Sequence, residues 1–373
     1  MKICVFPNDP ILSYYKKGEI KDRYYNPKNL FEEVNIISLI ENDIDESLVQ
    51  ALAGNATLKI YSVGRINLKN KNKNYSRVEE IVKKISPDII RAYSPYISGW
   101  LAAKCSVNLK IPFYLSLHTN VDYNKKLIKR SNFKKFISSK LSSKFIEPYV
   151  IKNASKITVV YKIIEPYVIK NGGKKPEVLH NRIDYDRFLN SVKIDNLKKP
   201  LIISVGSLIP EKNHSCLIDS MSFINAHLLI IGNGIEYDKL KKQIVKKNLK
   251  NKVQINQYVP HNEIQNYYKS ADVFALAYDP NLESIPMPVM EAMATGLPII
   301  IPYPNEEYSE GLEGISIFSK RDSNSFAMNI NRVLTNNSLH KKLSKASQDK
   351  AKEYDSKIIE SREKRIYEEI IFK

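Results

Sequence analysis

The sequence predicts an α/β protein with two doubly wound parallel sheets, and three observations carry this prediction. The chain has 373 residues, which is longer than a single hydrophobic core usually grows. Apolar runs of four to seven residues alternate nearly throughout with longer periodic segments, the pattern of parallel strands joined by crossover helices. A polar stretch at 184–199 interrupts the alternation before Pro200. We therefore predict two Rossmann-like domains that face each other across a cleft.

The apolar runs give the strands of each domain in order. The first domain, 1–183, has candidate strands at 2–6, 34–39, 56–61, 87–93, 112–118 and 156–160. The second, 200–352, has them at 201–206, 227–232, 252–258, 272–277 and 297–301, with a late edge strand at 315–318. Between the domains we expect an interdomain connection at 184–199, and after them a terminal segment, 353–373, that forms a helix.

Composition favours a globular protein of a reducing compartment. No window approaches the ~20 apolar residues of a transmembrane helix, and the first residues lack the flanks of a signal peptide. The three cysteines are far apart and each lies in or beside an apolar stretch, so we expect core residues. We therefore expect cytoplasmic residence.

The net charge of +18 is concentrated in the first half of the chain. Residues 1–190 hold 33 Lys and Arg against 18 Asp and Glu, and residues 191–373 hold 25 against 22. Within the first half, 124–146 carries eight positive charges and no acid, with apolar residues at roughly helical spacing. This pattern predicts a cationic amphipathic helix. Its polar face is either merely solvated or contacts an anionic membrane surface at the inner leaflet. Nucleic acid is the weaker alternative, because no nucleic-acid motif is present.

Three strand-to-helix junctions in the second domain could bind an anion. Ligands of such sheets bind at the carboxyl ends of strands, where helix N-termini offer N–H groups. Gly206 closes the first strand and Lys212 lies just before a helix. Gly232 and Gly234 follow the second strand, where they allow a close approach of the backbone. In the third junction, Pro288 suits a first helical position. Together they describe a groove that holds a diphosphate on backbone amides with Lys212 as a point charge.

Two carboxylates, Glu283 and Glu291, flank the third junction. An acid beside a diphosphate would repel it, but an ionised carboxylate only accepts hydrogen bonds and therefore suits sugar hydroxyls. We interpret both glutamates as hydroxyl ligands. Taken alone, each also fits a solvated loop acid or a helix-dipole partner.

The ordered set of motifs resembles the family-four retaining glycosyltransferases of the GT-B fold. Their nucleotide-sugar site carries a Glu-x7-Glu motif, which here is Glu283-SIPMPVM-Glu291. The stretches PDIIRAYSPYISGWLAAK, PFYLSLHTN, HNRIDYDRF, VGSLIPEKN, IIGNG and QYVP are similar to further elements of the family and follow in its order.

The resemblance implies a role for each matching residue. Glu283 would bind hydroxyls of the donor hexose and Glu291 the ribose, while Lys212 would face the diphosphate. His118 would approach the donor sugar from the first domain. The remaining donor contacts implied are Gly206, Gly232, Asn233 and Gly234 along the nucleotide, Tyr258 and Val259 near the base, and main-chain N–H groups of the stretch Ser284, Ile285, Pro286, Met287.

Two departures from the family concern the donor and the acceptor. Ser207 stands where the family has a diphosphate-binding arginine, which removes a bidentate phosphate contact. The first strand is followed by PNDPILSYYKKGEI in place of the family's Gly-rich loop, so Asp9, Lys17 and Gly18 are assigned to the acceptor side.

We therefore expect a retaining hexosyltransferase that uses a nucleotide diphosphate sugar, a glycan, lipid-linked or small-molecule acceptor, and neither a metal ion nor another cofactor. Its terminal helix would cross back onto the first domain, as in the family. The alternatives are a GT-B nucleotide-sugar epimerase or hydrolase, and a non-catalytic relative that binds membrane or nucleic acid.

Overall fold

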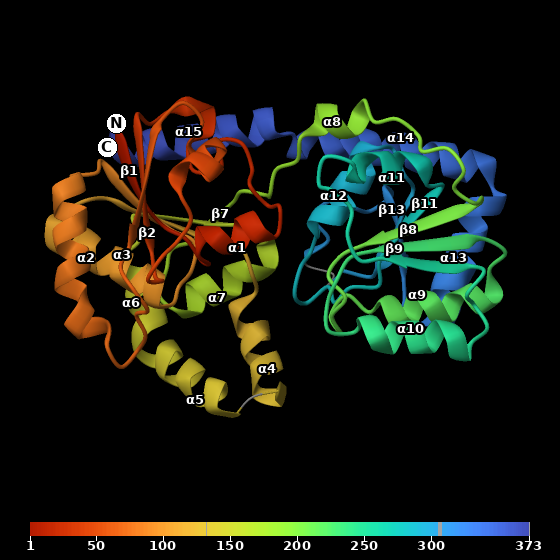
Figure 1. Cartoon of the computed structure of the whole chain (residues 1–373), viewed down its shortest axis with the longest axis horizontal. Helices are drawn as coiled ribbons and strands as arrows, with labels where there is room; N and C mark the ends of the chain where they lie inside the picture. The colour runs from red at the N-terminus through yellow and green to blue at the C-terminus, as the bar shows by residue number, and fades with distance from the viewer. Residues whose placement is uncertain (132, 305–307, 373) are drawn as a thin grey trace. The chain divides into compact units, whose positions relative to one another are not determined.

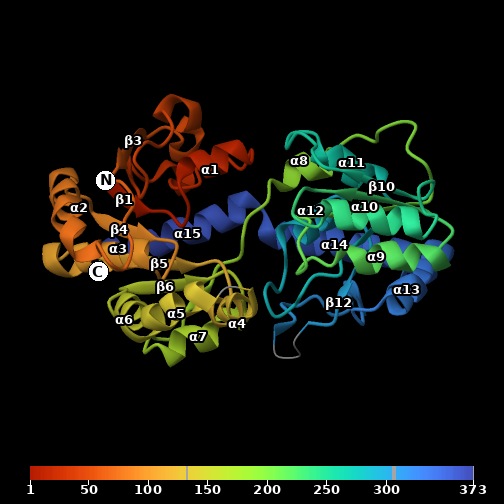
Figure 2. The same cartoon turned by 60° about the horizontal axis from the view of Figure 1, so that its bottom comes forward.

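The computed structural model describes residues 1–131, 133–304 and 308–372 and confirms the predicted fold class. Its strands form two sheets whose pairings are all parallel. The chain divides into two compact units, Met1–His180 with Glu360–Lys373, and Asn181–Ile359. Each unit contains one sheet (Figures 1 and 2). The stretch 184–199, which the sequence suggested as a connection, lies within the second unit.

The first sheet has the strand order β3-β2-β1-β4-β5-β6-β7. The chain order reverses between β1 and β4, so the carboxyl ends of these two strands border the crevice where such sheets bind ligands. The two-residue strand β7 has no counterpart among the predicted strands, because so short a segment shows no periodicity. The strands are β1 (Lys2–Phe6), β2 (Glu33–Ser38), β3 (Thr57–Ser62), β4 (Ile89–Ala92), β5 (Phe113–Leu117), β6 (Lys156–Val159) and β7 (Glu177–Val178).

Helices of the first unit include a basic pair, α4 (Val121–Ser131) and α5 (Phe133–Leu141), which protrudes as a hairpin in Figure 1. The prediction of one helix over 124–146 is therefore wrong: a π-helical turn, Ser142–Ile146, follows α5. Ser131, the last residue of α4, is of a type that competes for backbone hydrogen bonds and favours helix ends. Residue 132 lies outside the described residues. The other helices are α1 (Ile11–Lys16), α2 (Lys71–Ile85), α3 (Ile97–Leu109), α6 (Glu147–Lys152), α7 (Glu165–Lys170) and the terminal α15 (Ser356–Ile371).

Buried charge pairs fix the end of α15 in the first unit. Arg91 of β4 is 2 % exposed and donates to the Glu363 carboxylate and the Tyr367 hydroxyl. Its guanidinium also lies 4.4 Å from the centre of the Tyr93 ring. Nearby, Arg23 forms a bidentate pair with Glu360, at 3.2 and 3.3 Å. The segment from Glu360 to Phe372 thus belongs to the first unit, although the sequence places it far from that unit's strands.

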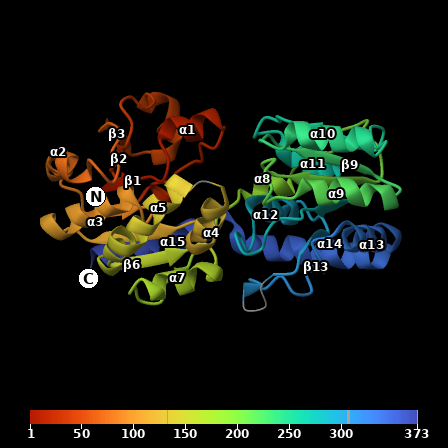
Figure 3. The same ribbon diagram turned by 90° about the horizontal axis from the view of Figure 1, so that it is seen from below.

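The second sheet has the order β10-β9-β8-β11-β12-β13 and reverses between β8 and β11. Helices α9, α10 and α13 lie on one face and α8, α11, α12 and α14 on the other (Figures 1 and 3). The strands are β8 (Leu201–Val205), β9 (His227–Ile231), β10 (Val253–Asn256), β11 (Val273–Ala275), β12 (Ile299–Pro302) and β13 (Ser316–Ser319). The helices are α8 (Tyr185–Leu189), α9 (His214–Ser220), α10 (Tyr237–Lys246), α11 (Ile264–Ser270), α12 (Met287–Ala294), α13 (Ser323–Thr335) and α14 (Asn337–Ala351).

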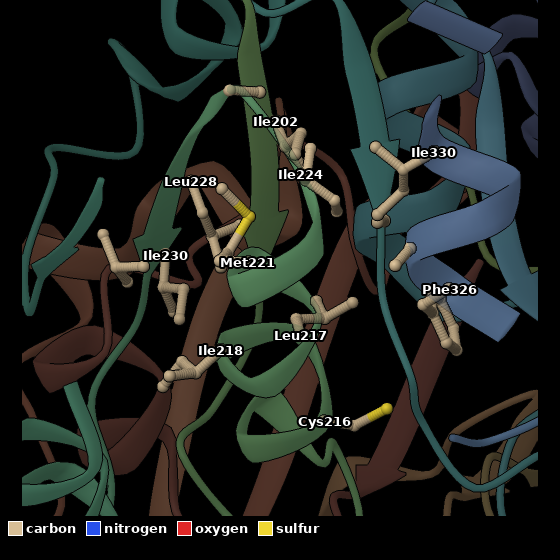
Figure 4. Close-up of a cluster of buried hydrophobic side chains, with 14 of the residues drawn as sticks. Ile202, Cys216, Leu217, Ile218, Met221, Ile224, Leu228, Ile230, Phe326 and Ile330 are labelled. Carbon is tan, nitrogen blue, oxygen red and sulfur yellow. The ribbon is translucent and has the colours of Figure 1, made fainter. Parts of the chain in front are cut away.

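Apolar side chains between the sheet and the α9 face form the core of the second unit (Figure 4). Ile202 and Ile230 come from the strands, Leu217 and Met221 from the α9 segment, and Phe326 from α13. All five are at most 1 % exposed. This packing fixes the loops at the carboxyl ends of β8 and β11 on rigid elements.

Candidate functional site

Two glycines bring the loops after β8 and β9 into direct backbone contact. A Cβ on Gly232 would lie 2.0 Å from the carbonyl oxygen of Gly206, and one on Gly234 would lie 2.4 Å from that of Leu208. No larger residue fits at either position. The Leu208 N–H donates to the Asn233 carbonyl at 2.8 Å, which closes the contact. The predicted close backbone approach is therefore present.

At the switch point between β8 and β11, Lys212 and Glu283 form an ion pair. The Lys212 ammonium lies 2.8 Å from a Glu283 carboxylate oxygen, and the two side chains are 11 % and 26 % exposed. The Asp279 N–H donates to the Glu211 carbonyl at 2.8 Å, so the loop after β11 is tied to the loop after β8. The residues assigned from the sequence to the diphosphate and to the hexose are thus in direct contact.

Glu291, inside α12, accepts a hydrogen bond from the Tyr268 hydroxyl of α11 at 2.9 Å. Burial, and then the nearby Glu291 carboxylate, raise the pKa of Tyr268 well above its ordinary value, so the phenol remains a donor. Since a carboxylate accepts about four hydrogen bonds, Tyr268 orients Glu291 and leaves it capacity for a ligand. Tyr268 was not predicted from the sequence, because an apolar helix face gives the same signal.

The entrance to α12 is rigid. Ile285 is fully buried, and the Tyr278 hydroxyl donates to the Ser284 carbonyl at 2.7 Å. The helix begins at Met287, directly after Pro286, with Pro288 in its first turn. Its N-terminal N–H groups are therefore held at the carboxyl edge of the sheet, where an anion binds favourably.

The residues assigned to the base are more exposed. Tyr258 follows β10 and is 79 % exposed, and Val259 is half-buried. The side-chain oxygen of Asn233 accepts from the Gly234 N–H at 2.8 Å and from Gln257 at 3.3 Å. Ser207 is exposed, beside Gly206.

Two further polar groups at this edge were missed by the sequence analysis. His214, the first residue of α9, is 1 % exposed and its Nδ1 lies 3.2 Å from the Ser204 hydroxyl. Arg321 follows β13 and donates to the Ala277 carbonyl at 3.2 Å. The only sequence signal for His214 is its position two residues after Lys212.

The residues assigned to the sugar and the acceptor from the first domain all lie in the first unit. His118, directly after β5, has its ring 5.3 Å from that of Tyr93 and its Nε2 3.3 Å from the Ser116 hydroxyl. Asp9 is exposed after β1 and accepts from the Asn8 amide at 3.1 Å. Lys17 and Gly18 directly follow α1 and are exposed.

Neither a metal cluster nor a membrane span is found in the described part of the chain. No group of three His, Cys, Asp or Glu residues there could hold a metal ion. No helix within the same residues is long and apolar enough to cross a bilayer.

Comparison with known proteins places these features in a family context. Residues 187–350 match the model of the family "Glycosyl transferases group 1". An uncharacterized glycosyltransferase of Methanocaldococcus jannaschii is 22% identical over 79% of this chain and 79% of its own. The Escherichia coli UDP-Gal:alpha-D-GlcNAc-diphosphoundecaprenol alpha-1,3-galactosyltransferase is 24% identical over 52% of this chain and 53% of its own length.

The fold also matches solved structures over its whole length. The Anabaena protein HepE, determined in complex with UDP, superimposes with a TM-score of 0.75 at 15% identity, covering 99% of this chain and 100% of that one.

Proposed function

We propose that this chain, which is a glycosyltransferase of GT-B fold, moves a hexose from a nucleoside diphosphate sugar to an acceptor hydroxyl with retention of configuration and without a metal ion. The observation that carries the proposal is the Lys212–Glu283 pair at the β8/β11 switch point. It combines a cation that suits a diphosphate with a carboxylate that suits a sugar hydroxyl.

The donor would bind by exchange of this pair. Without a ligand the two charges neutralise each other at 2.8 Å. A diphosphate would draw the Lys212 ammonium, and the hexose hydroxyls would then replace it at Glu283. Glu291, already oriented by Tyr268, would receive the ribose hydroxyls. In the bound state, sugar hydroxyls would donate hydrogen bonds to both carboxylates, and the Lys212 ammonium would pair with the diphosphate.

Charge that develops on the leaving diphosphate would be stabilised by Lys212 and by the N-terminus of α12. The bond between the sugar C1 and the phosphate oxygen breaks while the acceptor oxygen attacks C1 on the same face. The acceptor's proton passes to an oxygen of the departing diphosphate, so no separate protein base is required. His118 would contact the donor hexose.

For the acceptor we propose a lipid-linked or membrane-associated saccharide, reached through the basic hairpin of α4 and α5. Ile137, Leu141 and Phe145 are 48%, 51% and 61% exposed among lysines. Apolar side chains among lysines suit the interface of an anionic leaflet. The E. coli relative is named for a diphosphoundecaprenol-linked acceptor, which supports the same class here and a peripheral place at the inner membrane face.

Donor turnover tests the catalytic part of the proposal. Purified protein is incubated with UDP-, GDP- and ADP-hexoses, with and without membrane extract, and nucleotide release and product anomer are measured, the latter by NMR. We expect turnover with one donor that survives EDTA, yields a product with retained configuration, and is lost in Glu283→Ala. Absence of turnover with every donor would contradict transferase activity, and release that is independent of any acceptor would favour a hydrolase.

Vesicle flotation tests the membrane part. Lys125 is unsuitable for replacement, because it pairs with the fully buried Glu147 at 2.5 Å. The test variant therefore replaces exposed lysines of the hairpin and of the π-helical turn that follows it, and the control replaces as many on α10 of the second unit. We expect only the first to lose binding to vesicles containing anionic phosphatidylglycerol; equal flotation of both would contradict the proposal. The two sets are Lys126, Lys129, Lys140 and Lys144, and Lys239, Lys241, Lys242 and Lys246.

A further inference from the structure

His214 presents a buried nitrogen to the candidate donor site. Its ring is 1 % exposed, and Nδ1 lies 3.2 Å from the Ser204 hydroxyl. Nε2 has no hydrogen-bond partner among the described residues. A buried polar atom left without a partner costs free energy and is uncommon in native proteins. The orphaned Nε2 therefore indicates a partner that is absent from the unliganded chain.

Gly206 shows where that partner would lie. A Cβ on Gly206 would be 3.8 Å from Nε2 of His214 and 3.8 Å from Cγ and Cδ of Lys212. Because residue 206 is a glycine, this position beside the backbone holds no side chain. The space is bordered by the imidazole and the lysine stem, at the carboxyl end of β8 where the diphosphate is proposed to bind.

The ring is suited to donate a hydrogen bond there. Burial lowers the pKa of His214 to about 4, so the imidazole is neutral at pH 7 and carries one N–H. If the Ser204 hydroxyl donates to Nδ1, the hydrogen is on Nε2. The backbone of Gly206 and Ser207 lies near the ring and favours its protonated form, but no backbone atom has hydrogen-bond geometry to Nε2.

We propose that His214 is a donor-binding residue whose Nε2–H binds the diphosphate beside Lys212. The proposal rests on the proposed function and adds to it a phosphate ligand. It also gives a reason why Ser207, an exposed hydroxyl, can stand where the family has an arginine. Another arginine of this edge, Arg321, is held by the Ala277 carbonyl and lies 3.7 Å from Asp279, so its charge is already countered.

The test isolates the diphosphate from the rest of the nucleotide. Calorimetry gives the affinity for UDP, GDP and ADP and for the matching nucleosides, and the ratio of the two affinities measures the diphosphate contribution. His214→Phe keeps an aromatic ring in the core, and His214→Gln restores an N–H near the position of Nε2. His340→Phe is the matched control, because the Nε2–H of His340 in α14 donates to the Asp272 carbonyl, 2.9 Å away, directly before β11.

We expect His214→Phe to lower the ratio of the diphosphate and nucleoside affinities roughly tenfold, which is the effect of one hydrogen bond to a charged group. Its affinity for the nucleoside should be unchanged. His214→Gln should recover most of the ratio, and His340→Phe should not lower it. Thermal unfolding of each variant shows that the second unit is folded. An unchanged ratio in folded His214→Phe would overturn this inference alone, whereas a wild-type chain that binds no diphosphate more tightly than its nucleoside would overturn the proposed function as well.

Discussion

Removing the carboxylate of Glu363 should strongly lower the free energy of unfolding of the first unit, because it leaves the Arg91 charge buried without its anionic partner. Arg91 is 2 % exposed and Glu363 is 6 % exposed. Breaking such a pair costs about 3–5 kcal/mol. Three aromatic rings, those of Tyr93, Tyr114 and Tyr367, stay around the guanidinium in the variant, and a cation–π contact of about 1 kcal/mol favours the lower end of this range. We therefore expect Glu363→Ala to cost about 3 kcal/mol.

The single tryptophan makes this measurable for one unit. Trp100 lies in α3 of the first unit and is the chain's only tryptophan, so its fluorescence during urea unfolding reports on that unit alone. With a urea dependence of about 2–3 kcal/mol/M, the midpoint should fall by about 1 M. The control is Glu368→Ala on the same helix, where a partly exposed pair with Lys364 at 2.9 Å contributes about 0.5 kcal/mol or less.

A double variant separates the pair's net contribution from the penalty of breaking it. Arg91→Met with Glu363→Leu removes both charges and should recover much of the stability lost in Glu363→Ala. Equal midpoints for Glu363→Ala and Glu368→Ala would refute the reasoning, since a buried unpaired guanidinium would then cost no more than a surface charge.

Three further predictions concern the second unit. Tyr268→Phe should weaken UDP binding and reduce the preference for UDP over its 2′-deoxy analogue severalfold, because Glu291 loses its orienting donor. An unchanged preference in calorimetry would argue against Glu291 as a ligand of the ribose. Gly232→Ala should destabilise the unit by about 3 kcal/mol or more, because the new Cβ meets a backbone oxygen at 2.0 Å, whereas Gly206→Ala, with its nearest contact at 3.8 Å, should cost less in thermal unfolding. Burial lowers the pKa of His214 from 6.5 to about 4, so the unfolded chain binds the proton more tightly and stability is lost as pH falls from about 6.5 to 4. The pKa difference corresponds to about 3 kcal/mol of unfolding free energy. His214→Gln should therefore flatten the pH dependence of the melting temperature over that range.

The local pattern of the sequence was sufficient to predict every strand of the two sheets except β7. Runs such as 2–6 and 227–231 form strands as expected, since alternation of apolar runs with helical periodicity is a short-range property. Gly232 and Gly234 were also predicted as points of close backbone approach, because a glycine at a strand end has few other uses. The predicted single basic helix was wrong, since helix boundaries depend on weak local preferences that periodicity does not reveal.

By itself, then, the sequence determined the fold class and the order of the strands along the chain, because strands and helices are signalled by local patterns. It also led to the proposal of Glu283 and Glu291 as donor ligands, through their place in an ordered set of motifs. Only the tertiary structure decided which side chains meet. Lys212 pairs with Glu283, 71 residues further along the chain, and Arg91 pairs with Glu363, 272 residues further along. Tyr268 of α11 donates to Glu291 of α12. Such contacts depend on the order of strands within each sheet and on where the terminal helix packs, and these are set by burial of the whole chain rather than by any local pattern.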